Sequence, residues 1–223
     1  MNLQEAVLAR HSVRSYLDKP LDPTAVAELQ ALIAGLNAES GLHMQLMLNE
    51  SAPFDGLLSK IGWLAGVKNY LALVGPDDDA LDEKCGYYGE RFVLEAQMRG
   101  ISSCWVGGTY KKGKCTAQVG PDEKLALVIA LGYAKNPGRP HKSKGFDAVT
   151  AVSGAAPEWF RRGVECALLA PTAVNQQAFK FELVGTDGVR ATASRGAYAT
   201  VDLGIVKYHF EIGAGEGDWK WVK

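Results

Sequence analysis

Apolar side chains recur every three or four residues in two segments near the start of the chain. This spacing predicts a helix over residues 3–10 that ends near Ser12. It predicts a second helix from Pro23 to the Gly35–Asn37 region, with Asp22 as its N-cap. The apolar stripe of this second helix consists of Val26, Leu29, Ile33 and Leu36. Both helices should therefore cover a core with one face.

Continuous apolar runs predict buried strands at residues 43–49, 70–75 and 124–134. Residues 51–66 have little periodicity and are predicted as a loop with a short helix. Residues 101–109, which are rich in small residues, are predicted as a loop before the strand at 124–134.

The segment 82–99 places Cys85, Tyr88, Phe92 and Ala96 on one face, which predicts a core helix that Gly100 ends. Gly86 and Gly89 lie inside this helix, where glycine lowers helix stability. They indicate close approach by another backbone or a flat ligand, with ordinary tight packing as the simpler interpretation.

The last third of the chain repeats the order helix, strand, strand, helix, at residues 157–170, 179–185, 188–194 and 201–215. A basic segment at 135–144 and a crossover connection at 145–157 precede it. The separation in sequence between Gly89 and Gly204 equals the separation between Gly100 and Gly215. These features suggest the hypothesis of two similar halves, about 1–145 and 146–223.

Composition is that of a soluble globular protein, with 223 residues of which 47% are hydrophobic and 22% charged. The formal charge of -1 provides no overall basic field for nucleic acid, and no apolar run reaches the ~18 residues of a membrane helix. The four cysteines form no C-x-x-C pair, which favours reduced thiols over a disulfide framework or a metal site. We therefore expect a cytoplasmic protein with no metal, no nucleic-acid partner and no membrane contact.

Three segments carry side chains suited to ligand binding. RHSVR, from Arg10 to Arg14, offers two guanidinium groups and a hydroxyl for a phosphate or carboxylate, or is a solvated helix end. APTAVNQQAFKF supplies hydroxyls and amides that suit a polar ring, or an ordinary capped turn. GISSCWVGG ends in two glycines that permit close backbone approach, and its Trp105 suits either a planar cofactor or the core.

Taken together, these segments resemble the FMN-dependent nitroreductase family. RHSVR resembles the element R-x-S-x-[RK], and APTAVNQQ resembles [AS]-P-[ST]-x-x-N-x-Q. GISSCWVGG after a glycine-ended helix and LVIALGYAKNPGRPHKSK are similar to two further family segments. In most members the proline element follows the arginine element by a few tens of residues, whereas here Pro171 lies near the C-terminus, as in a subgroup with a rearranged or duplicated chain.

The resemblance implies an α+β fold in which helices flank a mixed, mostly antiparallel sheet, as one domain over 1–223 with an internal pseudo-twofold. It implies FMN as cofactor, with the phosphate, the ribityl chain and the N1/O2 edge held by Arg10, His11, Ser12 and Arg14. Lys142 and Lys144 would reach the phosphate. The N5/O4 edge would be bordered by Trp105, Val106, Gly107 and Gly108, and the opposite side by Pro171, Thr172, Ala173 and Asn175.

The activity that the resemblance implies is hydride transfer from NAD(P)H through FMN to a small electron-poor acceptor, such as a nitroaromatic or a quinone, in ping-pong order. No residue is assigned as a catalytic acid or base. Two alternatives remain: a flavin- or small-molecule-binding module without turnover, and a specialised flavin dehydrogenase or dehalogenase. The late proline element indicates that one chain supplies both sides of the flavin, as a monomeric pseudo-dimer, or that the protein is a homodimer.

Overall fold

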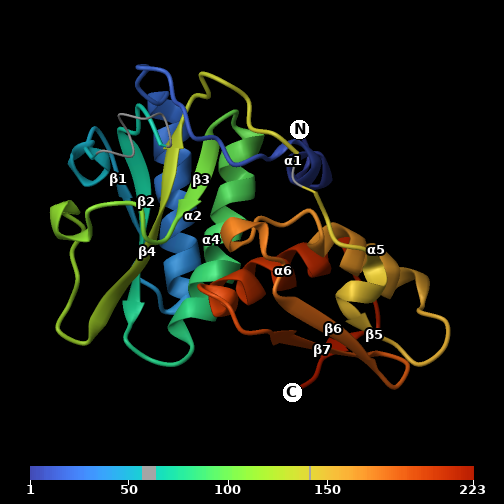
Figure 1. Cartoon of the computed structure of the whole chain (residues 1–223). Coiled ribbons are helices and arrows are strands. Elements are labelled where there is room, and N and C mark those ends of the chain that lie inside the picture. Colours follow the sequence, from blue (N-terminus) through green and yellow to red (C-terminus); the bar gives the residue numbers. More distant parts are fainter. Residues whose placement is uncertain (57–63, 141) are drawn as a thin grey trace.

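The computed structural model describes residues 1–56, 64–140 and 142–223, and it contains two four-stranded sheets with helices α4 and α6 packed between them (Figure 1). The α-helices are α1 (Leu3–Ala9), α2 (Pro23–Ser40), α4 (Leu81–Met98), α5 (Glu158–Ala167) and α6 (Ala199–Ala214). The strands of the first sheet are β1 (Gln45–Met47), β2 (Asn69–Pro76), β3 (Ser102–Val106) and β4 (Glu123–Gly132). Those of the second are β5 (Thr150–Ala151), β6 (Phe179–Val184), β7 (Gly188–Ala193) and β8 (Lys220–Trp221). The predicted α+β class is confirmed.

The two sheets differ in strand direction. The first has the order β1-β2-β4-β3 with every pair antiparallel. The second has the order β5-β6-β7-β8, in which only the central pair β6–β7 is antiparallel. The mixed character that the sequence predicts therefore comes from the second sheet, whose short edge strands β5 and β8 have no clear sequence pattern.

Two local predictions were wrong. The second helix does not end at Gly35–Asn37 but continues to Ser40, and Gly41 closes it with a left-handed φ of 73°. A glycine inside a helix costs only about 1 kcal/mol, which the buried Leu29, Ile33 and Leu36 offset. Residues 101–109 are not all loop, because Ser102–Val106 pair with β4 as strand β3.

Other predictions agree with the structure. Asp22 accepts hydrogen bonds from the N–H groups of Thr24 and Ala25, and Pro23 takes the first turn of α2. Gly100, with φ of 74°, follows α4 as predicted. In the segment 51–66, a 3₁₀ turn covers Ala52–Phe54, and residues 57–63 lie outside the described residues.

Helices α4 and α6 cross at a pair of glycines. A Cβ at Gly86 would collide with the carbonyl oxygen of Val201, and a Cβ at Gly204 would collide with the carbonyl oxygen of Glu83. Gly89 has a different neighbour, since a Cβ there would lie 2.6 Å from Cη2 of Trp105. The glycines of α4 thus permit close approach of a helix backbone and of an indole ring.

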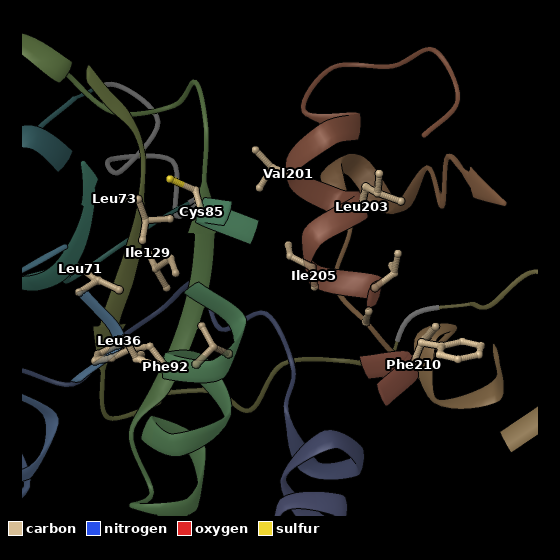
Figure 2. Close-up of a cluster of buried hydrophobic side chains, with 14 of the residues drawn as sticks. Leu36, Leu71, Leu73, Cys85, Phe92, Ile129, Val201, Leu203, Ile205 and Phe210 are labelled. Atoms are coloured by element: carbon tan, nitrogen blue, oxygen red, sulfur yellow. The ribbon is translucent and has the colours of Figure 1, made fainter. Parts of the chain in front are cut away.

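This crossing joins the two halves of the core. Figure 2 shows Leu71, Leu73 and Ile129 of the first sheet beside Phe92 of α4, with Val201, Leu203, Ile205 and Phe210 on α6 opposite them. All of these side chains are buried in one cluster that also contains Phe160 and Phe181 from the second half. The two sheets therefore share a single core, and α4 and α6 fix the position of one sheet against the other.

We expect Gly86→Ala to lower the free energy of unfolding by about 2–3 kcal/mol, because the new methyl group forces the helices apart. Denaturant unfolding measures this. The control is Gly35→Ala, at a helix position where nothing lies within 4 Å of the new Cβ. That substitution should raise stability by about 0.5–1 kcal/mol. Equal effects of the two substitutions would contradict the close crossing.

Candidate functional site

A cavity of about 110 Å³ lies where the two halves of the chain meet. One wall comes from the first half, with the segment after α1 and the end of β3. The other comes from the loop after α5 and the first turns of α6. The lining residues are Ser12, Arg14, Cys104, Trp105, Gly107, Leu127, Pro171, Thr172, Ala173, Val174, Tyr198, Val201, Asp202 and Ile205.

The cavity collects parts of all three segments singled out from the sequence. Those that line it are Ser12, Arg14, Trp105, Gly107, Pro171, Thr172 and Ala173. The remaining residues do not line it, namely Arg10, His11, Val106, Gly108, Lys142, Lys144 and Asn175. The three segments therefore converge at the cavity, although only half of the predicted site residues line it.

Strand β3 and the preceding chain bring the first two segments together. Ser12 forms a parallel bridge with Ser103, and the N–H of Val13 donates to the carbonyl of Ser103 at 2.9 Å. This pairing places the segment from Arg10 to Arg14 beside the strand that carries Cys104 and Trp105. Because side chains alternate along a strand, Ser12 and Arg14 can point to the same side.

The loop after α5 has an unusual backbone. Val174, Asn175 and Gln177 all have positive φ values, of 47°, 55° and 45°. Such conformations cost non-glycine residues free energy and persist only where the surroundings impose them. Strained backbone of this kind gathers at functional sites more than elsewhere.

Asp202 of α6 holds this loop in place. Its carboxylate accepts hydrogen bonds from the N–H of Ala173 at 3.0 Å and from Nε2 of Gln176 at 2.8 Å. Only 2% of Asp202 is exposed. Burial raises the pKa of this carboxyl to about 6, and the hydrogen bonds from Gln176 and Ala173 act in the opposite direction.

The predicted basic segment also supports the loop. Nζ of Lys144 donates to the carbonyl of Gln177 at 2.9 Å, and the N–H of Lys144 donates to Oε1 of the same residue at 2.7 Å. Nδ2 of Asn175 donates to the carbonyl of Lys142 at 3.0 Å. These bonds tie 142–144 to the strained loop beside the cavity.

A buried polar cluster lies behind Trp105 and is centred on Glu90 of α4. The fully buried Glu90 carboxylate accepts from Nε1 of Trp105 at 2.9 Å and lies 2.9 Å from Nε2 of His209. Nε of Arg10 is 3.7 Å from Glu90 and has no hydrogen-bond partner among the described residues. Burial lowers the pKa of Arg10, and the nearby charge of Glu90 partly offsets this. Arg10 thus supplies a positive charge close to the buried carboxylate of Glu90.

Cys104 lies in the cavity wall as a neutral thiol. Burial raises the pKa of Cys104, and the positive charges of Arg14 and Arg10 oppose that rise only in part. Among the residues that the structure describes, no group of three His, Cys, Asp or Glu side chains is placed to hold a metal ion. Nor is any described helix long and apolar enough to cross a membrane.

Tyr198 lines the cavity next to Gly107. A Cβ at Gly107 would collide with its ring, and a Cβ at Gly108 would lie 3.4 Å from its hydroxyl oxygen. The residue has a left-handed φ of 59° just before α6 and is 40% exposed. Its ring helps to explain why the cavity is smaller than the ~300 Å³ at which ligand pockets usually begin.

Sequence reasoning missed four residues that matter here: Glu90, Tyr198, Asp202 and His209. Glu90 and Asp202 did carry a signal, because each is an acid within a stretch of otherwise buried helix. A buried carboxylate needs partners, and its presence on a core face points to a polar cluster. Tyr198 has no comparable signal, since its position depends on the turn before α6.

The chain belongs to the protein family described as "Putative TM nitroreductase", which matches residues 2–214. A solved structure of a "putative nitroreductase" from Thermotoga maritima is similar over 96% of this chain and 83% of its own, with 21% identity and a TM-score of 0.70. No curated protein sequence matches this chain.

Other solved structures resemble a smaller part of the chain. A nitroreductase family protein from Streptococcus pneumoniae shares 16% identity and has a TM-score of 0.54. A "putative nitroreductase" from Desulfovibrio desulfuricans, in complex with FMN, shares 16% identity and has a TM-score of 0.52. Each of these two matches covers 66% of this chain. The match covers 98% of the Streptococcus pneumoniae protein and 94% of the Desulfovibrio desulfuricans protein. These likenesses show the fold, and the remaining third of this chain lies outside these two matches.

We expect Glu90→Ala to destabilise the protein by about 3–5 kcal/mol, because it leaves the buried Arg10 without its counter-charge. The matched control is Glu39→Ala, which removes the half-exposed partner of Arg91 and should cost less than about 1 kcal/mol. Unfolding in denaturant compares the two. A Glu90 variant as stable as the Glu39 variant would show that the cluster contributes nothing.

The raised pKa of Asp202 predicts a pH effect with a definite sign. Between about pH 4 and pH 6 the folded state holds the Asp202 proton more tightly than the unfolded state, so stability from this group falls as pH rises. We compare the free energy of unfolding of the wild type with that of Asp202→Asn. The wild-type value minus the variant value should fall between pH 4 and pH 6, by on the order of 2 kcal/mol. Thermal or denaturant unfolding at several pH values measures it. A difference that grows with pH would contradict the assignment.

Proposed function

We propose that this chain is an FMN-dependent NAD(P)H oxidoreductase that reduces small electron-poor acceptors such as nitroaromatics and quinones. The observation that carries the proposal is the single cavity that joins RHSVR, GISSCWVGG and APTAVNQQ. Membership of a nitroreductase family and the FMN complex of the Desulfovibrio desulfuricans protein support it. A "putative NADH dehydrogenase/NAD(P)H nitroreductase" from Parabacteroides distasonis, 17% identical, supports NAD(P)H as donor.

The residues of the cavity suit a flavin phosphate ester. Arg14 and Ser12 supply a cation and a hydroxyl donor at one wall, and Pro171 and Ala173 supply an apolar face opposite. Gly107 offers a backbone without a side chain. Outside the lining, Nε of Arg10 is a buried donor that has no acceptor among the residues that the structure describes. Tyr198, whose ring lies against Gly107, would have to turn away for Gly107 to border a flavin.

When bound, FMN supplies a two-electron redox centre, and the protein supplies binding, orientation and electrostatics. Arg14 places a positive charge in the cavity wall, which stabilises negative charge that develops on reduction. Glu90 fixes the orientation of Trp105 through its indole N–H. Asp202 and Lys144 hold the strained loop against the opposite side.

The shared cavity supports a ping-pong order of substrates. The nicotinamide donor would leave before the acceptor enters, because both would occupy the same small space. We assign no residue as a catalytic acid or base. We also infer a cytoplasmic protein, since all four cysteines are free thiols.

The test of the proposed function is the absorption spectrum of the purified protein. A yellow protein whose colour bleaches on addition of NADH or NADPH, and returns with a nitroaromatic or quinone, supports the proposal. Mass spectrometry of the released cofactor should identify FMN. A colourless protein that does not take up FMN would refute it, a yellow protein that ignores NAD(P)H would favour a binding module, and stoichiometric FAD would refute the choice of cofactor.

Two variants in the cavity wall separate charge from thiol chemistry. Arg14→Gln should lower the flavin midpoint potential and slow reduction by NAD(P)H, because the stabilising charge is lost. Cys104→Ala should leave turnover nearly unchanged, because burial keeps the thiol neutral. Stopped-flow reduction of both holoproteins measures this. An inactive Cys104→Ala that still holds FMN, beside a normal Arg14→Gln, would overturn the mechanism.

A further inference from the structure

A local twofold axis relates helices α4 and α6. It makes residue 204 on α6 the counterpart of residue 86 on α4, and this pair defines the shift in residue number between the two helices. The contacts at their crossing are reciprocal, since Gly86 faces the carbonyl of Val201 and Gly204 faces the carbonyl of Glu83. Reciprocal contacts of this kind are the property of a twofold interface. The same shift relates the first residues of the helices, Leu81 and Ala199.

The relation extends beyond the crossing. With this shift, β2 at Asn69–Pro76 overlaps β7 at Gly188–Ala193, and each strand leads directly into the crossing helix. Each strand also pairs antiparallel with the strand before it, β1 in one half and β6 in the other. The order α2-β1-β2-α4 is thereby repeated as α5-β6-β7-α6.

The cavity of the candidate site has a counterpart under this twofold. The α6 side of the cavity is formed by Tyr198, Val201, Asp202 and Ile205. Their counterparts on α4 are Ala80, Glu83, Lys84 and Tyr87. These four residues, together with Tyr88, line a separate open depression of about 360 Å³. The molecule thus carries two related hollows, one on each side of the helix crossing.

The chemistry of the counterpart is different. Val201 and Ile205 are replaced by Glu83 and Tyr87, and the acid Asp202 by Lys84. Glu83 forms an ion pair with Lys207 of α6, and the Tyr87 hydroxyl donates to Glu211 of α6. The polar groups of the counterpart are therefore used to link α4 to α6.

The remaining walls of the site, unlike the α6 wall, have no counterpart around the hollow on α4. The strained loop follows α5, at residues 168–178, whereas α2 is followed directly by Gly41 and then by β1 from Gln45. The segment before α5, residues 145–157, contains no Arg or Lys to match Arg10 and Arg14.

We propose that each chain binds one flavin, with both walls of the site supplied by that chain, and that the pseudo-symmetric hollow on α4 has become a clamp between the helices. This inference rests on the proposed function. A twofold assembly of two equal halves would have two flavin sites. Here the second has no counterpart of the strained loop or of Arg10 and Arg14, and its Glu83 and Tyr87 bind Lys207 and Glu211 of α6.

The experiment is to saturate the purified protein with FMN, remove free FMN by gel filtration, and measure the flavin-to-chain ratio together with the mass in solution. We expect one flavin per chain in a species with the mass of a single chain. Two flavins per chain would overturn the inference, as would flavin that is retained only in a species of two chains. No flavin at all would instead refute the proposed function.

Two variants sharpen the result. Lys207→Met removes the ion pair of the clamp and should leave the ratio at one while lowering the unfolding midpoint. Ala173→Trp fills the cavity and should abolish FMN binding while the circular dichroism spectrum stays that of the folded protein. Loss of flavin in Lys207→Met with an unchanged unfolding midpoint would place the site at the α4 hollow and overturn the inference.

Discussion

The contact between helices α4 and α6 determines where every wall of the cavity stands. The helix axes can approach so closely only because Gly86 and Gly204 present no side chain to the opposing carbonyl groups. α4 packs on the first sheet, whose strand β3 carries Trp105 and ends just before Gly107. α6 packs on the second sheet and carries Asp202. A wider crossing would separate the two walls, and the cavity would open into a surface groove.

The same crossing is reinforced by charge. Glu90 on α4 contacts His209 on α6 and reaches Arg10 after α1, so one buried carboxylate connects three separate segments. Buried charges of this kind cost free energy to desolvate and are a weak source of stability, but removing one partner is expensive. Their effect here is to hold Trp105 and the end of α1 in one arrangement beside the cavity.

Much of this arrangement could be predicted from the sequence, and the part that could not has physical reasons. The long helices and central strands have strong periodicity, and the three binding segments stand out by residue type. Strand β3 was missed because Ser102 and Ser103 interrupt its apolar pattern, and pairing with β4 overrides the weak local preference. The partner of Arg10 could not be predicted, because Glu90 lies far away in sequence and only the fold brings the two together.

The pseudo-symmetry was visible in the sequence only in outline. Gly89 and Gly204 suggested a relation between the helices, but the contacts pair Gly204 with Gly86, one turn earlier on α4. The spacing of two glycines cannot fix a helix register, because several shifts bring a small residue to the same face. Only the reciprocal backbone contacts distinguish between them.

We propose that one chain builds a whole flavin site from its two halves, and a crystal structure of the protein with FMN tests this proposal. We predict that Ser12 and Arg14 lie on one side of the flavin and Thr172 and Ala173 of the same chain lie on the other, with the Tyr198 ring moved off Gly107. A flavin that contacts the first pair from one chain and the second pair from another chain would contradict it.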